Sequence, residues 1–339
     1  MWRFINVYLL LIVMKNYLLI PGICLVYFLT GNYKLPLNCK SVTVFVDHTI
    51  TQNANKYLLI TDQSQNRILI VDADAGKITW EWKPENDGVL PKDTKWFSAP
   101  SDVKSVYNGK YLLIVASGGG VALVRISDKK TVFYSYAGGN THSADLLPDG
   151  NIVTASSTAN YLMVFNTDTL HFHDSLYRKK IYLPFAHNVV WDQKRQLLWS
   201  AGRNKLYTYK YNFDCLKPDL ILADSTILPD TDAHDLYPVF GKDQLWLTTV
   251  HGVFSVNPST KKVTAVEASS IKDIKNVSSG PAGYATVMMQ PKTSWWTDEV
   301  KDDKGKTIFK QEGLKIYKAR WLLTDTFSNQ PLSDIKVCR

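Results

Sequence analysis

The feature that most restricts the fold of this 339-residue chain is a short segment that recurs every forty-odd residues. Neighbouring copies begin 38 to 47 residues apart, at Ser101, His142, His187, His234 and Lys272. A turn signal such as Asn108-Gly109 follows each copy, and then an apolar strand. These strands span residues 111–116, 152–155, 197–201, 245–250 and 284–289. A third apolar run and a weaker fourth complete each unit.

Four short strands in every unit of this length are the signature of a β-propeller blade. One more copy precedes residue 101, in residues 57–62, 67–71 and 78–82, which brings the total to six. We therefore predict an all-β fold, a six-bladed β-propeller with four antiparallel strands per blade, as one domain over residues 40–339. Residues 41–47 have two candidate places, the inner strand of blade one or the outer strand of blade six.

Composition agrees with a strand-rich globular chain. Hydrophobic residues make up 45% and aromatic residues 12% of the sequence, which contains many Val, Ile and Thr residues that favour sheets. Two stacked β-sandwiches are the alternative fold, but they do not explain one segment at similar spacing five times. The formal charge of +8 contains no run of five like charges, so nucleic-acid binding is not expected.

The first 39 residues have the character of a signal peptide. They contain Arg3, Lys15 and Lys34 but no acidic residue, and residues 17–30 form an apolar stretch of signal-peptide size. Met14 is a candidate for the true start of translation. The alternative to a cleaved signal peptide is a retained membrane anchor. We expect an exported protein, periplasmic or at the cell surface, with no stable membrane span after processing.

The cysteines have no metal-type spacing, which excludes a zinc ribbon. Cys24 lies in the predicted signal, and Cys39 and Cys338 lie at the two ends of the predicted domain. An oxidising compartment can join Cys39 to Cys338, which leaves Cys215 unpaired. Three free thiols in the processed chain are an equal alternative.

Several longer motifs carry a resemblance to a known family. They are Val115 to Val124, Gly138 to Ala144, Leu147 to Val153 and Trp295-Trp296-Thr297. With these motifs the chain resembles an uncharacterised family of exported six-bladed propellers from gut Bacteroidetes, over roughly residues 45–325. The resemblance implies export, six blades and a setting of glycan-harvesting gene neighbourhoods, but no catalytic residues.

Three of the repeated segments begin with histidine, namely His142, His187 and His234. The first residue of an innermost strand lies near the mouth of a propeller, so these imidazoles are expected to converge. Three neutral imidazoles with an open fourth position are the pattern of a catalytic divalent-metal site. In the alternative interpretation the histidines are polar anchors that hydrogen-bond neighbouring loops. His171, His173 and His251 are expected at the surface.

Other side chains fit a bound ligand. Lys104 and Lys275 come three residues after their repeat starts and can neutralise a carboxylate, whereas Asp102, Asp235 and Asp273 are expected to satisfy backbone donors on the opposite side of their strands. Trp295 and Trp296 can stack on a sugar ring.

Two functions follow from these residues. One is a metal-assisted lyase or hydrolase for an acidic glycan, in which Tyr237 or a histidine among His142, His187 and His234 removes a proton. The other is a non-catalytic module that binds a glycan or a protein at the same mouth. We expect a monomer in either case, with a glycan or another small acidic ligand as partner.

Overall fold

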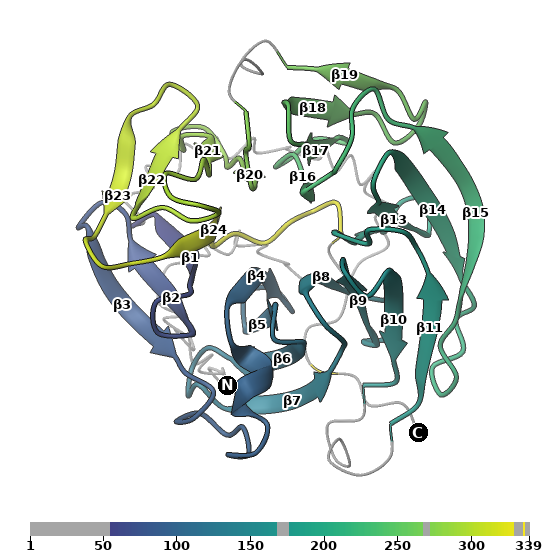
Figure 1. The fold of residues 1–339 in the computed structure, drawn as a ribbon, viewed down its shortest axis with the longest axis horizontal. Coiled ribbons are helices and arrows are strands. Elements are labelled where there is room, and N and C mark those ends of the chain that lie inside the picture. Colours follow the sequence, from purple (N-terminus) through teal and green to yellow (C-terminus); the bar gives the residue numbers. More distant parts are fainter. Residues whose placement is uncertain (1–54, 168–175, 267–271, 329–334, 336–339) are drawn as a thin grey trace, which may run out of the picture. The chain divides into compact units, whose positions relative to one another are not determined.

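The computed structural model describes residues 55–167, 176–266, 272–328 and 335. In these residues, 24 strands form six sheets of four strands each, arranged as blades around one axis (Figure 1). All strand pairs within the blades are antiparallel. This part of the chain contains no α-helix and one short 3-10 helix, η1 (Thr94–Phe97). The predicted six-bladed β-propeller is confirmed.

Three blades come from residues 57–182 and from the last strand of the described residues. From the axis outward, blade one contains β24 (Ile316–Trp321), β1 (Tyr57–Asp62), β2 (Arg67–Asp72) and β3 (Lys77–Trp82). Blade two contains β4 (Pro100–Val106), β5 (Tyr111–Ala116), β6 (Gly120–Arg125) and β7 (Thr131–Tyr136). Blade three contains β8 (Thr141–Leu146), β9 (Ile152–Ser156), β10 (Tyr161–Phe165) and β11 (Arg178–Tyr182).

The other three blades follow in chain order. Blade four contains β12 (Val190–Asp192), β13 (Leu197–Ala201), β14 (Lys205–Tyr211) and β15 (Leu220–Ile227). Blade five contains β16 (Asp235–Pro238), β17 (Leu245–Thr248), β18 (Val253–Val256) and β19 (Val263–Ala265). Blade six contains β20 (Val277–Ser278), β21 (Val287–Met288), β22 (Glu299–Asp302) and β23 (Thr307–Lys310).

The ring closes through blade one, whose innermost strand comes from the opposite end of the described chain. β24 pairs with β1, with Leu58 opposite Trp321 and Ile60 opposite Ala319. The two places considered for residues 41–47 are thus taken by β24 and β23. That segment lies outside the described residues, as do the predicted signal (1–39), Met14, Cys24, Cys39, His171, His173 and Cys338.

The hydrophobic core lies between neighbouring blades. Trp82 packs with Phe97, Leu112 and Ile114 between blades one and two, and other clusters of the same kind fill the further junctions. Trp82, Trp191 and Trp199 are fully buried, while Trp80 and Trp246 pack at the edges of these clusters. These tryptophans therefore pack the junctions between blades.

Glycines permit close approach at two blade turns. A Cβ on Gly118 would lie 2.5 Å from Ser98 Oγ, and one on Gly138 would lie 1.8 Å from Tyr161 Oη. Gly138 also has a φ of +114°, which side-chain-bearing residues rarely adopt. The runs Gly118-Gly119-Gly120 and Gly138-Gly139 therefore form tight turns and are not phosphate-binding loops.

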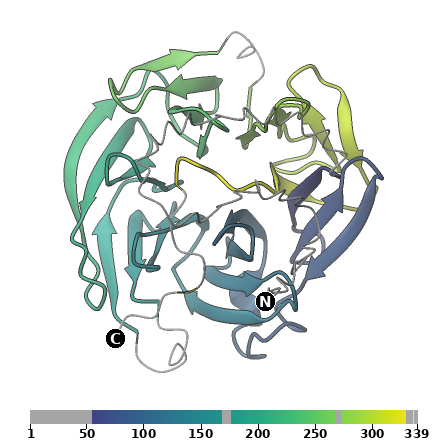
Figure 2. The same ribbon diagram turned by 180° about the vertical axis from the view of Figure 1, so that it is seen from behind.

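After β24 the chain crosses the axis. The segment 322–328 runs across the middle of the ring toward blades four and five, and both ribbon views show this crossing (Figures 1 and 2). Phe327 anchors it by packing with Val190 and Trp199, and its carbonyl accepts a hydrogen bond from the Gln193 N–H at 3.2 Å. The crossing segment therefore covers one end of the axis.

Cys215 takes part in a disulfide bond. The expectation that it is left unpaired is wrong, and all other cysteines of the chain lie outside the described residues. Disulfides persist in oxidising compartments and are rare in the cytosol.

Changing Cys215 to serine is expected to lower the free energy of unfolding by about 2–4 kcal/mol, because the cross-link restricts the unfolded chain. Urea titration of the oxidised variant and wild-type protein measures this loss. Alkylation of denatured, unreduced wild-type protein gives an independent check, because the Cys215 peptide should carry no label. A labelled Cys215 would contradict the disulfide.

Candidate functional site

Six side chains, one from each blade, surround the axis at the end where the inner strands begin. We call them the anchor ring, and they are Ser101, His142, His187, His234, Lys275 and Tyr317. Backbone pairing shows that three of them are equivalent, because the N–H groups of His187, His234 and Lys275 each donate to a carbonyl at the end of the second strand. The other three lie at β-bulges between the first and second strands of their blades.

The ring corrects one position of the sequence repeat. Lys275 occupies the place that spacing assigned to Lys272, which is exposed three residues earlier. Lys275 is therefore a ring residue, whereas Lys104 lies deeper, as expected. With Lys275 in place of Lys272, the spacing between the last repeat starts becomes more regular.

The three histidines meet as predicted. The rings of His142 and His187 stack with centroids 4.2 Å apart, and the rings of His187 and His234 meet edge to face at 5.2 Å. Tyr317 Oη lies 3.3 Å from His142 Nδ1, and Lys275 Nζ lies 3.4 Å from His234 Nε2. Imidazole, ammonium and phenol groups therefore form one polar cluster.

The environment keeps these imidazoles neutral. Burial and the positive charge of Lys318 lower the pKa of His142 to about 3. Burial and Lys275 lower the pKa of His234 to about 3, and burial also holds the pKa of His187 well below its usual value. Each ring consequently carries one N–H donor and one acceptor nitrogen at neutral pH.

The cluster does not fit a metal ion. The lone pair of an imidazole nitrogen lies in the ring plane, so the stacked rings of His142 and His187, inclined by only 15°, cannot both point at one ion. His234 directs Nε2 toward the Lys275 ammonium. Within the described ranges, no group of three His, Cys, Asp or Glu side chains has an arrangement that could hold a metal.

The cluster has more donors than acceptors. Both ring nitrogens of the buried His187 and Nδ1 of His234 lack a hydrogen-bond partner among the described residues. Lys275 is also buried, and in this part of the chain it makes no ion pair with a carboxylate. Burial lowers the pKa of Lys275. An acceptor with negative charge would satisfy these groups.

Below the ring, a compact ion network fills the axis. Arg320 donates to both oxygens of Asp102 at 2.9 and 3.1 Å and to both oxygens of Asp235 at 2.8 and 3.1 Å. Lys318 Nζ lies 3.0 Å from Asp235 Oδ1. All four side chains are almost fully buried. Burial opposes ionisation of Asp102, but Arg320 and Lys318 outweigh it and lower its pKa.

This network corrects the roles expected for the aspartates. Asp102 accepts a hydrogen bond from the backbone N–H of Val103, as predicted, but its main partners are the cations of β24. Asp235 likewise binds Lys318 and Arg320. Because the ion pairs are mutually satisfied, they hold the inner strands together. Lys275 makes no direct ion pair among the described residues, although the negative charge of Asp273 acts on it and opposes part of the effect of burial.

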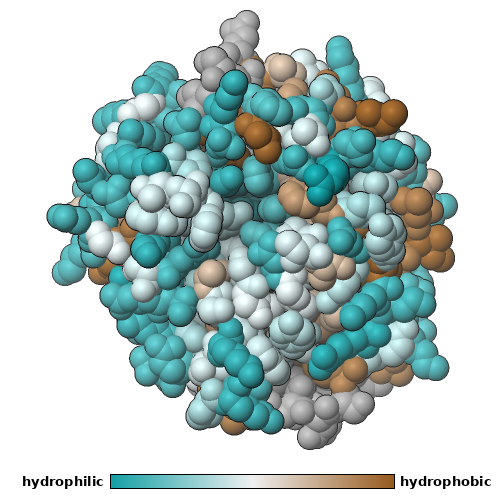
Figure 3. Space-filling model, in the orientation of Figure 1, coloured by the Kyte–Doolittle hydropathy of each residue, from teal (hydrophilic) through white to brown (hydrophobic). Residues whose placement is uncertain are grey.

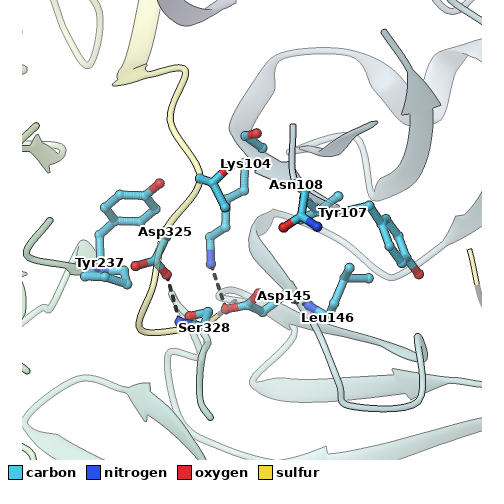
Figure 4. Close-up of a pocket in the computed structure, with 12 residues that line it drawn as sticks. Lys104, Tyr107, Asn108, Asp145, Leu146, Tyr237, Asp325 and Ser328 are labelled. Atoms are coloured by element: carbon cyan, nitrogen blue, oxygen red, sulfur yellow. Dashed lines mark hydrogen bonds and ion pairs between the residues drawn. The ribbon is translucent and has the colours of Figure 1, made fainter. Parts of the chain in front are cut away.

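The far end of the axis contains a separate small cavity (Figure 4). It measures about 40 Å³ and is lined by Lys104, Asp145, Tyr237, Asp325 and neighbours. Lys104 Nζ lies 3.4 Å from Asp145 Oδ2 and donates to the Val189 carbonyl at 2.7 Å. Burial raises the pKa of both Asp145 and Asp325. A cavity of this size holds only a few water molecules.

Tyr237 and Lys104 therefore lie apart from the histidines. The guanidinium carbon of Arg320 sits 3.9 Å from the centroid of the Tyr237 ring, and burial raises the pKa of this tyrosine. The predicted site is thus divided between the two ends of the axis. Of Lys104, Lys275 and Tyr237, only Lys275 joins the three histidines.

Trp295 and Trp296 lie on the same side of the propeller as the anchor ring. Consecutive strands are antiparallel, so the loop 289–298 between β21 and β22 emerges at the end where β20 begins. Trp295 is 55% exposed, and its Nε1 donates to Gln63 Oε1 at 2.9 Å. Gln63 in turn donates to the carbonyl of Pro100, beside Ser101. His251 is exposed and paired with Asp230.

A family model described as a family of unknown function (DUF6528) matches residues 35–338. The chain belongs to this family. No curated protein matches the sequence. Among solved structures, a protein of unknown function from Bacteroides caccae is similar at 15% identity, with a TM-score of 0.52, over 79% of this chain and 99% of that one. This likeness shows the fold alone, whereas the family model confirms that the chain belongs to an uncharacterised family.

Two further structures are more distant. The β-propeller domain of Cps50 (Swd1) from Myceliophteria thermophila matches at 11% identity and a TM-score of 0.48, over 77% of this chain and 87% of that one. Hydrazine synthase from Kuenenia stuttgartiensis matches at 14% identity and a TM-score of 0.43, over 68% of each chain.

No helix in the described ranges is long and apolar enough to span a membrane.

Sequence reasoning missed the contribution of β24. Tyr317, Lys318 and Arg320 were not assigned to any repeat, because the sixth inner strand follows the irregular stretch of blade six. The available signal is that Tyr317-Lys318-Ala319-Arg320 has the same alternation as Ser101-Asp102-Val103-Lys104. The pair Lys275-Asn276 similarly matches His187-Asn188 and would have corrected the repeat start at Lys272.

Proposed function

We propose that this protein is an exported, non-catalytic propeller module that binds the carboxylate of an acidic glycan at the anchor ring. The observation that carries the proposal is the donor excess around Lys275. A buried ammonium without a carboxylate partner lies beside imidazoles whose N–H groups have no acceptor in the described part of the chain. A carboxylate supplies both the charge and the acceptors, and hydrogen bonds between ionised groups are the stronger ones.

The pKa values favour binding over proton abstraction. A general base works best when its pKa is near the operating pH, whereas the pKa of His142 and of His234 is about 3. Tyr237, the other candidate base, lies at the far end beside Arg320. The described groups that meet Lys275 are therefore better suited to holding a ligand than to activating one.

The surroundings support a sugar as the rest of the ligand. Trp295 presents an exposed indole on the ring side of the propeller, and the C–H face of a pyranose packs well on an aromatic plate. Export is supported by the disulfide at Cys215 and by the apolar, acid-free first 39 residues.

The test is calorimetric titration with glucuronate, with glucose as the neutral control. Glucuronate should bind and glucose should bind at least tenfold more weakly. Lys275→Met should lower glucuronate affinity by about 10- to 100-fold, because a hydrogen bond to a charged group contributes about 1.5–3 kcal/mol. Lys272→Met, which removes an exposed lysine three residues away, is the matched control and should bind as wild type.

Equal affinity for glucuronate and glucose would overturn the carboxylate assignment. Appearance of an unsaturated uronate product, followed by ultraviolet absorbance with a polyuronate substrate, would overturn the non-catalytic assignment in favour of a lyase.

A further inference from the structure

A second hollow lies beside the anchor ring on the same side of the propeller. Its volume is about 470 Å³, within the range of small-ligand sites, and its lining includes Trp296, Lys315, Lys292 and Asp298. Lys315 immediately precedes β24, which contributes Tyr317 to the ring. Two residues of extended strand span about 7 Å, so Lys315 in the lining of the hollow is about this far along the chain from the ring residue Tyr317.

The hollow has a cation and an aromatic face available. Lys315 Nζ lies 5.3 Å from the centroid of the half-buried Trp296 ring, and this exposed lysine makes no ion pair within the described ranges. The acidic lining residue Asp298 is already paired with Lys292 at 3.0 Å. The charge left for a ligand is therefore positive, next to an aromatic plate.

Trp295 joins the hollow to the ring. It is the neighbour of Trp296, and its indole is fixed through Gln63 to the carbonyl of Pro100, next to the ring residue Ser101. Backbone bonds strengthen the same connection, because Gln63 N–H donates to the Lys315 carbonyl at 2.9 Å. Hydrogen bonds through Gln63 thus connect Trp295 and Lys315 to the edge of the ring.

We infer that the ligand is an oligosaccharide with repeated acidic units, which places one carboxylate at Lys275 and a neighbouring unit in the hollow of Trp296 and Lys315. This inference rests on the proposed function and adds to it a second subsite and a minimum ligand length. A single uronate would occupy the ring alone, whereas a longer chain would contact both cations.

The test measures the affinity of galacturonate and of its oligomers of increasing length. In the wild-type protein, affinity should rise at least tenfold from the monosaccharide to short oligomers and then reach a plateau. Lys315→Met and Trp296→Ala should each remove most of this increase and leave the affinity for the monosaccharide unchanged. Lys315 is exposed and Trp296 half-buried, and thermal melting of each variant verifies the fold.

The chain offers a matched control pair. Lys129 Nζ lies 5.9 Å from the centroid of the Trp80 ring, a contact similar to that of Lys315 with Trp296, but it is in the loop between β6 and β7 at the opposite end of the strands. Lys129→Met should therefore keep the full dependence on length.

The outcomes separate the two proposals. Affinity that is the same for monosaccharide and oligomers in the wild-type protein overturns the second subsite while the carboxylate site at Lys275 stands. Loss of monosaccharide affinity in Lys315→Met or Trp296→Ala also contradicts two separate subsites. Absence of binding by galacturonate of any length, or binding that Lys275→Met does not weaken, overturns the proposed function itself.

Discussion

Replacing Arg320 by methionine is expected to lower the free energy of unfolding by about 3–5 kcal/mol, the largest effect of any single substitution considered for this propeller. Arg320 is fully buried and makes four hydrogen bonds to Asp102 and Asp235. Its removal leaves two buried carboxylates with Lys318 as their remaining cation in the network. Urea unfolding followed by tryptophan fluorescence measures the loss.

An exposed ion pair provides the control for this substitution. Arg125 forks onto Asp128 with bonds of 2.9 and 2.7 Å, but the two side chains are 36% and 48% exposed and screened by solvent, so Arg125→Met should cost far less stability than Arg320→Met. Adding Asp102→Asn to Arg320→Met should restore part of the stability, since it removes one unpaired charge. An Arg320→Met protein as stable as Arg125→Met would show that the buried network does not support the ring.

Acid should destabilise the protein through the histidines of the anchor ring. The pKa of His142 and of His234 is about 3 in the folded protein, below the ordinary value of 6.5. Between these values the unfolded chain binds more protons than the folded one, so the free energy of unfolding falls as pH falls. From pH 6.5 to about pH 4 each histidine should remove about 3 kcal/mol.

The contribution is isolated by comparison with variants. In His142→Asn combined with His234→Asn, neither position titrates, so the dependence of stability on pH over this interval should flatten. Burial raises the pKa of Asp145 and Asp325, which acts in the opposite direction, but these groups are common to both proteins. Unchanged slopes in the double variant would contradict buried neutral histidines.

Much of the fold was predictable because blades are local. A turn signal followed by an apolar run locates β5, β9 and β13 closely, since each hairpin is specified by its own residues. The closing strand was not predictable in this way. β24 pairs with β1 across more than 250 residues of sequence, and the alternation within residues 317–320 indicates an inner strand but not the strand with which it pairs.

The site was predicted in part for the same reason. Spacing alone placed His142, His187 and His234 together, because equivalent positions in a repeat become neighbours around an axis. Spacing did not show which side chains of β24 contact those of the other blades. The ion pairs of Arg320 were therefore missed, and Asp102 was given a backbone role. The orientation of the imidazole rings depends on packing, and it is this orientation that argues against a shared metal ion.

Apolar side chains are concentrated at one outer edge. Figure 3 shows hydrophobic atoms on the side where Figure 1 places β15, and Ile221, Leu222 and Ile227 are 62%, 55% and 74% exposed. A long outer strand with apolar side chains is a place where a sheet can pair with another chain. Because this edge can pair with a second molecule, low protein concentration favours the single chain.

The closure of blade one by β24 has a consequence for biosynthesis. While the chain is being made, β1, β2 and β3 form a blade without its innermost strand, and the edge of β1 stays unpaired until residue 321 has left the ribosome. Neither Lys318 nor Arg320 is available earlier to neutralise Asp102 and Asp235. The ring of blades is therefore complete only once residues 316–321 are available to pair with β1.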